Sequence, residues 1–269
     1  LHNHARMWFA SIWVYTLGLP RQLGADFFYR HLMDGDPASN TLGWRWVCGL
    51  HTSGKTYLAR PSNIAHFTDN RFYPEGQLAT RAPALSENLT HPVARLSPLE
   101  VLPAEGRFGL LITEEDCNPE SLGLNRPPEA VLGGIATHLR SPLPVGESAR
   151  DFAEGAVRDA VERAARHFAT DTALSKSDDW GEMLLNWASK HRLRTIATAY
   201  APIGPVAELL ADVKNRLASN GISLMRLQRL HDGITWPHSR RGFFRMKKQI
   251  PSILDTLGLG EDRDRQKAG

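Results

Sequence analysis

Cysteine is scarce in this sequence. The 269 residues include only Cys48 and Cys117, which are far apart and lack C-x-x-C spacing. Two such cysteines do not form a disulfide framework, and they argue against a cysteine-rich zinc or iron–sulfur site. The histidines show no metal-ligand spacing either, so we expect no metal site.

Long apolar runs are also lacking. The chain has no charged segment followed by an apolar leader, and no apolar run of about 18 residues, the length that a membrane helix requires. We therefore expect no secretion signal, no membrane partner and a cytoplasmic location. The chain starts with Leu1 instead of methionine, so we also expect it to be a fragment of a longer gene product.

The remaining composition is that of an ordinary soluble protein, with 42% hydrophobic and 23% charged residues. A net charge of +3 and a pI near 9.0 permit an anionic partner without requiring one. At 29.9 kDa the chain is long enough for two modest domains, each with a core of its own.

Residues 1–35 carry apolar side chains at helical spacing, which predicts two helices. Gly18 ends the first helix and Pro20 suits the first turn of the second. Residues 36–104 are rich in Pro, Gly, Asn and Ser, which predicts loops and short helices that end in a linker. We therefore expect a helical domain over residues 1–95.

From residue 108 onward, short apolar segments alternate with amphipathic ones. The predicted strands are 108–113, 130–136, 195–199 and 222–227, and the predicted helices are 149–168, 180–191 and 206–220. This alternation indicates a doubly wound, Rossmann-like α/β domain, which we place at residues 105–258. No G-x-G-x-x-G motif occurs, so NAD binding is not supported. The fold class is thus mixed α and α/β, with a flexible tail at residues 259–269.

An acidic loop follows the second predicted helix, with Asp34 and Asp36 on either side of Gly35. Carboxylates at the C-terminal end of a helix are disfavoured by about 0.3–1 kcal/mol each unless a cation compensates. Arg6, one helix earlier, is the expected partner if the two helices run antiparallel. An exposed Asp-Gly turn is the alternative, since both residues are common in turns.

Three clusters in the first 46 residues carry a family resemblance. They read LHNHARM at 1–7, DGDPASN at 34–40 and GWRW at 43–46. In residue types and in the gaps between clusters, this segment resembles the flavin pocket of the DNA photolyase and cryptochrome family. It is similar to the second half of that family's all-helical FAD domain. The resemblance implies FAD as the cofactor, and it implies that the first half of the FAD domain lies upstream.

The resemblance also implies roles for single positions. In the family, the positions of Arg6 and Asp34 form an ion pair beside the isoalloxazine ring. The position of Asp36 meets the flavin's polar edge or ribityl chain, and that of Asn40 faces flavin N5, where an amide can donate or accept. The predicted cofactor-binding residues are Asn3, Arg6, Asp34, Asp36, Asn40 and Gly43.

The activity implied by the resemblance is blue-light-driven repair of pyrimidine dimers in UV-damaged DNA, by electron transfer from FAD. The positions of Asn3, Met7 and Trp46 line the cavity that receives the flipped dimer, where a tryptophan offers a flat face for stacking. Core packing is the alternative for Trp44 and Trp46. A cryptochrome-type light sensor without repair activity is the alternative function, and a scaffold that has lost its flavin is a third.

Trp44 matches the flavin-proximal tryptophan of the family's photoreduction chain. The sequence departs from the pattern at the next tryptophan, which falls at Arg21 and cannot carry an electron hole. Trp8 and Trp13 are candidate substitutes, although helix packing explains both equally well. His4 stands where many repair enzymes of the family have arginine.

Residues 49–56 match the expression G-x-x-x-x-G-K-[ST] of a phosphate-binding P-loop. A P-loop requires a long helix after it, so that backbone N–H groups and the helix N-terminus hold the phosphates. Pro61 would end such a helix early. We therefore interpret this stretch as a loop.

The C-terminal domain resembles, more weakly, the family's light-harvesting domain at residues 195–202, 213–217, 221–223 and 242–246. In the family that domain precedes the FAD domain, so the resemblance implies either a permuted order or a separate appended domain. It also admits a second antenna chromophore. A basic cluster with two interleaved aromatics is found at Arg240, Arg241, Phe243, Phe244, Arg245, Lys247 and Lys248. It could contact phosphates, although a solvated surface helix is the simpler interpretation.

Overall fold

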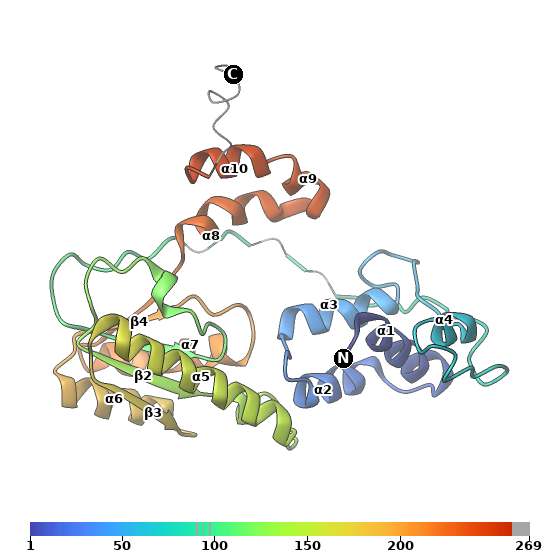
Figure 1. Ribbon diagram of the computed structural model, residues 1–269, viewed down its shortest axis with the longest axis horizontal. Coiled ribbons are helices and arrows are strands. Elements are labelled where there is room, and N and C mark those ends of the chain that lie inside the picture. The colour runs from blue at the N-terminus through green and yellow to red at the C-terminus, as the bar shows by residue number, and fades with distance from the viewer. Residues whose placement is uncertain (90, 93, 97, 260–269) are drawn as a thin grey trace.

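The computed structural model describes residues 1–89, 91–92, 94–96 and 98–259, with the side chains of 240 and 241 excepted. A helical part comes first, an α/β part follows, and a short helical arm ends the described chain (Figure 1). None of the described helices has the length and apolar character needed to span a bilayer. Of the tail predicted at 259–269, residues 260–269 lie outside the described residues.

The helical part consists of α1 (Asn3–Ser11), which continues as the π-helix η1 (Ile12–Thr16), then α2 (Arg21–His31), α3 (Pro37–Val47) and α4 (Pro61–His66). The two helices predicted within residues 1–35 are therefore confirmed, and Gly18 separates them with a positive φ of 65°. Ala10, Phe28, Trp44 and Val47 form the small core of this part.

Helix α3 is longer than the sequence interpretation allowed, since residues 36–104 were expected to form loops and short helices. Its eleven residues begin at Pro37, directly after Asp36, whose carboxylate accepts a hydrogen bond from the backbone N–H of Ser39. Asp at the N-cap followed by proline at the first position is a strong start signal. The Asp-Gly-Asp-Pro stretch was interpreted as an acidic loop, with an exposed turn as the alternative, and this start signal was missed.

The α/β part contains one five-stranded sheet in the order β3-β2-β1-β4-β5, and every pair of neighbours is parallel. The strands are β1 (Phe108–Thr113), β2 (Ala130–Ile135), β3 (Thr172–Lys176), β4 (Thr195–Ala199) and β5 (Ser223–Leu227). The crossover helices are α5 (Glu147–Phe168), α6 (Trp180–His191) and α7 (Pro205–Ser219). The predicted parallel sheet is confirmed, with one strand more than the sequence indicated. Strand β3 was missed because it is a short edge strand with polar, partly exposed residues and no apolar run.

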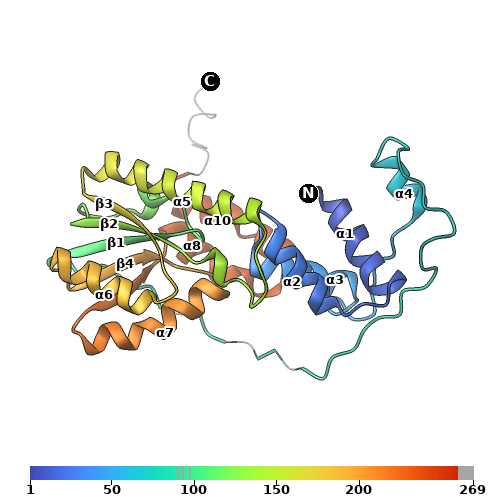
Figure 2. The same ribbon diagram turned by 90° about the horizontal axis from the view of Figure 1, so that it is seen from below.

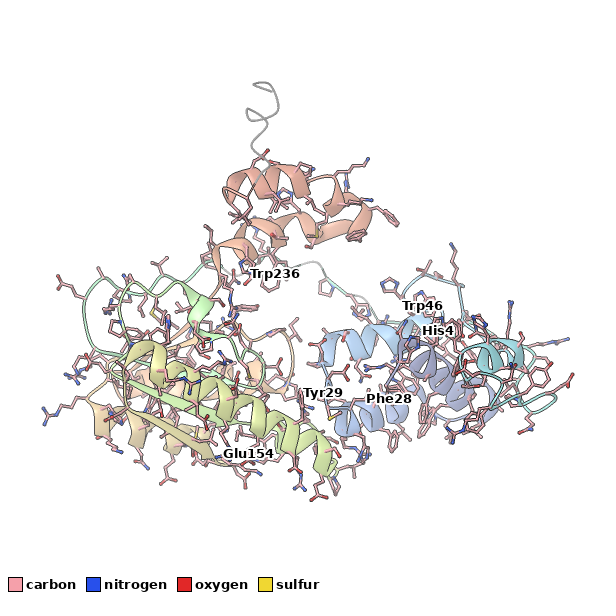
Figure 3. The ribbon with its side chains drawn as sticks, viewed as in Figure 1. His4, Phe28, Tyr29, Trp46, Glu154 and Trp236 are labelled. Atoms are coloured by element: carbon pink, nitrogen blue, oxygen red, sulfur yellow. The ribbon has the colours of Figure 1, made fainter. Side chains whose placement is uncertain are left out.

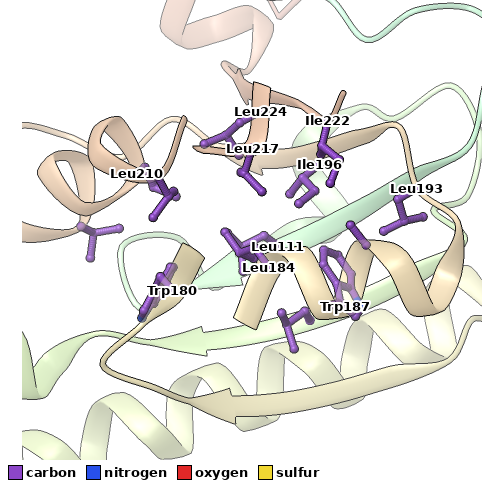
Figure 4. Close-up of a cluster of buried hydrophobic side chains, with 14 of the residues drawn as sticks. Leu111, Trp180, Leu184, Trp187, Leu193, Ile196, Leu210, Leu217, Ile222 and Leu224 are labelled. Atoms are coloured by element: carbon purple, nitrogen blue, oxygen red, sulfur yellow. The ribbon is translucent and has the colours of Figure 1, made fainter. Parts of the chain in front are cut away.

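Helices cover both faces of the sheet. One face packs against α6 and α7 through a cluster that includes Trp180, Leu184 and Leu210 (Figure 4). The other face packs against α5 through Val157 and Val161. Residues 133 and 134 of β2 are both glycine because an added Cβ would lie 2.7 Å from Val161 on one face and 2.7 Å from Trp180 on the other.

Short helical segments complete the fold. They are η2 (Pro119–Leu122), η3 (Thr137–Leu139), α8 (Leu230–Thr235), η4 (Trp236–Arg241), α9 (Phe243–Lys247) and α10 (Ile250–Thr256).

The helical part meets the α/β part where α2 reaches the N-terminal end of α5 (Figure 2). The Gly146 backbone N–H donates to the carbonyl oxygen of Arg30 at 2.9 Å, and the Arg30 guanidinium donates to the carbonyl oxygen of Pro144 at 2.8 Å. The Arg140 guanidinium lies 5.2 Å from the centre of the Tyr29 ring. These contacts hold α2, and the acidic loop after it, against the α/β part.

Candidate functional site

A cavity of about 590 Å³ lies among α1, α2, α3 and the acidic loop. Its lining includes every site residue predicted from the sequence: Asn3, Arg6, Met7, Asp34, Asp36, Asn40, Gly43, Trp44 and Trp46. Three segments that are up to 43 positions apart in the sequence therefore contribute to one concave surface. The roles assigned to these residues through the resemblance stay predictions.

The cavity has further lining residues that were not singled out as site residues. They are His4, Ala10, Phe28, Leu32, Gly35, Ser39 and Val47. Ala10, Phe28 and Val47 are buried and belong to the helical core. Helical periodicity indicates that such residues are buried, but it carries no signal that a cavity lies above them.

The ion pair expected between Arg6 and Asp34 is present. A guanidinium nitrogen of Arg6 lies 2.6 Å from a carboxylate oxygen of Asp34, and the Arg6 Nε donates to the carbonyl oxygen of Leu1 at 2.9 Å. The hydrogen bond from Arg6 holds the pKa of Asp34 below its usual value. The Asp34 side chain is 65% exposed, so this is a surface pair, whose contribution to stability is about 1 kcal/mol or less.

Asp36 has a structural duty that the sequence interpretation did not assign. Its Oδ1 accepts the backbone N–H of Ser39 at 2.6 Å and caps α3. We expected the partial negative charge at the C-terminal end of α2 to disfavour this carboxylate, and for Asp36 this expectation was wrong. Asp36 lies at the N-terminus of the next helix, where negative charge is favourable.

Asn40 joins α3 to α2 through its side-chain amide, which donates to the carbonyl oxygen of Ala25 at 2.8 Å. One of the two amide N–H groups is therefore engaged within the protein. The contact fixes the rotamer of a residue that lines the cavity, so the group expected to face a flavin nitrogen is held in place before any ligand binds.

The two tryptophans of the GWRW motif differ in their surroundings. Trp44 is 2% exposed, and its ring meets Phe28 edge-on with the centroids 5.3 Å apart. Gly24 makes room for it, because an added Cβ there would lie 2.1 Å from the Trp44 ring. Trp46 is 40% exposed and lies 5.7 Å from the Tyr57 ring. Core packing therefore describes Trp44, whereas Trp46 offers an accessible ring beside His4 (Figure 3).

Of the two candidate relay tryptophans, Trp13 is the one in contact with Trp44. Their rings meet edge-on at 6.3 Å between centroids. Trp8 donates its indole N–H to Asn63 at 2.8 Å and lies beside a different aromatic group. Arg21, at the position where the family has a tryptophan, pairs with the carboxylate of Glu87.

Residues 49–56 form a chain of turns, as the interpretation of this segment as a loop predicted. Thr56 bridges back to Cys48 in antiparallel fashion, and the next helix begins only at Pro61. The glycines at 49 and 54 have positive φ values of 75° and 78°, which suit turns. Although residues 49–56 match the P-loop expression, no helix of the described chain begins directly after them to hold a phosphate at its N-terminus.

The topological switch point of the sheet is the second place where a ligand could be expected. In doubly wound sheets ligands bind beyond the carboxyl ends of the strands where the strand order reverses, which here lies between β1 and β4. This chain's own helical part reaches into that region. Pro37 packs against Gly204 after β4, where an added Cβ would lie 2.5 Å from the proline ring.

Acidic groups from both parts of the chain come close at the same junction. Glu114, after β1, accepts the Ala136 backbone N–H at 3.1 Å and the Thr137 hydroxyl at 2.7 Å. Burial, together with the neighbouring charges of Glu114 and Asp36 and against the opposing charge of Arg140, raises the pKa of Glu115 to about 7. The junction thus joins the acidic loop of the cavity to the carboxyl end of the central strand β1.

Comparisons with known proteins agree with the resemblance. Residues 1–82 match the family model described as the FAD binding domain of DNA photolyase. A deoxyribodipyrimidine photo-lyase of Streptomyces griseus is 46% identical over 64 residues, which are 24% of this chain and 13% of that protein. The corresponding protein of Salmonella typhimurium is 39% identical over 58 residues, 22% of this chain and 12% of that one. That of Vibrio cholerae is 30% identical over 81 residues, 30% of this chain and 17% of that one.

Residues 1–82, less than a third of the chain, are thus similar to the FAD binding domain of DNA photolyase. The chain spans about an eighth to a sixth of the length of these curated relatives. No solved structure matches the chain.

Proposed function

We propose that this chain contributes the C-terminal half of an FAD site that serves blue-light-driven repair of pyrimidine dimers in DNA. The observation that supports this most directly is that all nine residues predicted from the sequence line one cavity. We also propose that residues 1–95 act as the helical FAD half-domain. Residues 105–258 then form a permuted relative of the family's light-harvesting domain.

The polar groups of the cavity suit a flavin. Arg6 supplies a fixed positive charge held by Asp34, and Asn40 supplies an amide held by α2. FAD, when bound, supplies light absorption and electron transfer, and the protein orients it and adjusts its electrostatic surroundings. The accessible ring of Trp46 offers a stacking face for an extruded base, and the buried ring of Trp44 offers a nearby donor with Trp13 behind it.

A second antenna chromophore is not proposed at the switch point of the sheet. Pro37 of the helical part packs there against Gly204, and the Glu114 carboxylate is already engaged by the Ala136 backbone N–H and the Thr137 hydroxyl. If the parent protein carries an antenna chromophore, we expect it to bind elsewhere.

The first test is a titration of the chain with FAD, followed by flavin absorbance in the blue and by quenching of tryptophan fluorescence. We expect weak, saturable binding, because part of the family's site is supplied by other residues. Asp34→Ala should weaken it by about fivefold, the size expected for an exposed ion pair. Glu154→Ala is the matched control, since it removes a carboxylate paired with Arg158 on α5. If both variants changed the affinity for FAD equally, Asp34 would not be part of the FAD site.

The second test separates repair from light sensing. The flavin-loaded protein is mixed with an oligonucleotide that contains a pyrimidine dimer and is exposed to blue light. Loss of dimers, reduced in Trp46→Ala while FAD stays bound, supports repair. Flavin photochemistry with every dimer intact would instead support the cryptochrome-type sensor.

The third test concerns the route of electrons to the photoexcited oxidised flavin. Trp44→Phe should slow photoreduction sharply, because phenylalanine keeps an aromatic ring at this position but lacks the easily oxidised indole. Trp13→Phe should shorten the charge-separated lifetime in transient absorption, whereas Trp8→Phe should leave it unchanged, because only Trp13 contacts Trp44. Identical lifetimes in both variants would exclude this local route.

A further inference from the structure

The arm formed by α8, η4, α9 and α10 is anchored to the α/β part at its base. Arg229, just before α8, donates to Asp116 at 2.8 Å, and Trp236 meets the Tyr200 ring edge-on at 5.1 Å. Ile253 of α10 is buried. The arm projects from the sheet, and α9 lies at its outer end (Figure 1).

Helix α9 presents two adjacent phenylalanines to solvent. The Phe243 side chain is 62% exposed and that of Phe244 is 81% exposed, with their rings 5.8 Å apart and inclined at 65°. A solvated surface helix, the simpler interpretation of this sequence, accounts for exposed lysines and arginines. It does not account for two exposed aromatic rings side by side, which are typical of a contact surface.

The exposed rings stand in a strongly cationic setting. Arg245, Lys247 and Lys248 are exposed next to them. Residues 233–254 contain no aspartate or glutamate at all, so no carboxylate within the segment neutralises these cations. The α9 surface thus combines two apolar rings with three cations and no carboxylate. It consists of Phe243, Phe244, Arg245, Lys247 and Lys248.

We propose that this α9 surface binds single-stranded DNA outside the flavin cavity. Aromatic rings that stack on bases, flanked by cations that meet phosphates, are the usual means by which proteins hold unpaired strands. A duplex fits less well, because its bases are already stacked and present only their edges. A membrane surface also fits less well, because the five residues of α9 form less than two turns and provide no long amphipathic stripe.

This inference rests on the proposed function for the choice of DNA as the partner, and it adds a contact that lies on the arm of the α/β part. A strand held at α9 would keep the nucleic acid associated with the protein independently of any lesion. Binding at this surface is therefore expected in the dark, without flavin and with undamaged DNA.

The test measures fluorescence anisotropy of a short, labelled, undamaged single-stranded oligonucleotide with the full chain, in the dark and without FAD. Phe243→Ala and Phe244→Ala should each weaken binding at least fivefold, as loss of a base-stacking ring does. An oligonucleotide with abasic sites in place of its bases should bind wild type and Phe variants alike. Both rings are exposed, so the variants should keep the thermal unfolding midpoint of wild type.

The cationic part of the surface is tested by salt dependence. Lys247→Ala/Lys248→Ala should reduce the slope of log affinity against log salt concentration by about 1.4, the value for two phosphate contacts on a single strand. The matched control is Arg166→Ala/Lys190→Ala, which removes two exposed cations from α5 and α6. The control should leave the slope nearly unchanged.

Several outcomes would overturn the proposal. They are wild-type affinity in the Phe variants, an equal loss in the control variant, tighter binding to anionic lipid vesicles than to DNA, or self-association that depends on the phenylalanines. Failure of the proposed function would be seen in a different experiment, the FAD titration, as absence of FAD binding by the wild-type chain or as an equal affinity of wild type and Asp34→Ala. The two failures are distinguishable because the anisotropy measurement involves neither flavin nor light.

Discussion

Glu115→Gln is the substitution for which the structure supports the sharpest expectation. Glu115 follows β1 at the junction between the sheet and the acidic loop. Burial, together with the charges of Glu114 and Asp36, raises its pKa from 4.5 to about 7, against the opposing effect of Arg140. In the unfolded chain the carboxyl loses its proton near 4.5, whereas in the folded protein it keeps it until about 7.

Between these two values the folded state holds one proton more than the unfolded state. The free energy of unfolding therefore falls as the pH rises through this window, and the full penalty is present above it. The shift corresponds to about 3 kcal/mol as an upper limit, and partial exposure of the side chain reduces the expectation to about 1–2 kcal/mol. Glutamine keeps the shape and cannot ionise, so the variant should avoid this penalty.

The assay is urea unfolding of wild type and Glu115→Gln at pH values on both sides of the window. The stability difference should be near zero below pH 4.5 and should favour the variant by about 1–2 kcal/mol above pH 7. Taking the difference cancels groups that titrate alike in both proteins. Because Asp36 lines the cavity, the affinity for FAD should become less dependent on pH in the variant.

Glu120→Gln is the control with the opposite sign. Burial acts to raise the pKa of Glu120, but the hydrogen bond and charge of Arg163 bring it below its usual value. This carboxylate contributes stability above its unfolded pKa and loses it as the pH falls, so the control should be destabilised at neutral pH. A stability difference for Glu115→Gln that stays constant with pH would refute the reasoning.

Two further predictions concern packing and the arm. Gly24→Ala should destabilise the helical part by about 1–3 kcal/mol, because its Cβ would overlap the Trp44 ring. Gly43→Ala should be neutral or slightly stabilising in thermal unfolding, because its Cβ would meet no described neighbouring element within 4 Å. Similar melting temperatures for the two variants would contradict the close contact. Arg229→Met should lower stability by about 3–5 kcal/mol, because it leaves the largely buried Asp116 carboxylate without its main partner. Calorimetry of this variant and of the double variant Asp116→Leu/Arg229→Met, which should recover most of the loss, checks this expectation.

The predictions from sequence succeeded where structure depends on local pattern. The strands at 108–113 and 195–199 are short segments of mainly apolar and β-branched residues, and helix 149–168 repeats alanine and valine on one face. Strand 172–176 was missed because an edge strand need not be apolar. Helix α3 was underestimated because its start signal, Asp36 followed by proline, lay within a stretch that also suits a turn.

The candidate site was also predictable to a large extent, for a different reason. The residue types and their spacing match a family motif that can be read directly from the sequence, so a common cavity was expected before any fold was known. This motif includes Asn3, Arg6, Asp34, Asn40 and Trp44. Their environments were not expected. The sequence left open whether Asp34 is exposed, and it carries no signal that the Asn40 amide donates to α2, because both depend on how the helices pack.

By itself, then, the sequence determined the alternation of helices and strands and the set of polar residues around the cavity, since both depend on residue identity and short-range periodicity. Only the tertiary structure decided which tryptophan lies against Trp44 and that Phe243 and Phe244 stay exposed. It also decided that Pro37 reaches the switch point of the sheet. These outcomes depend on contacts between segments far apart in the chain, and no local pattern records them.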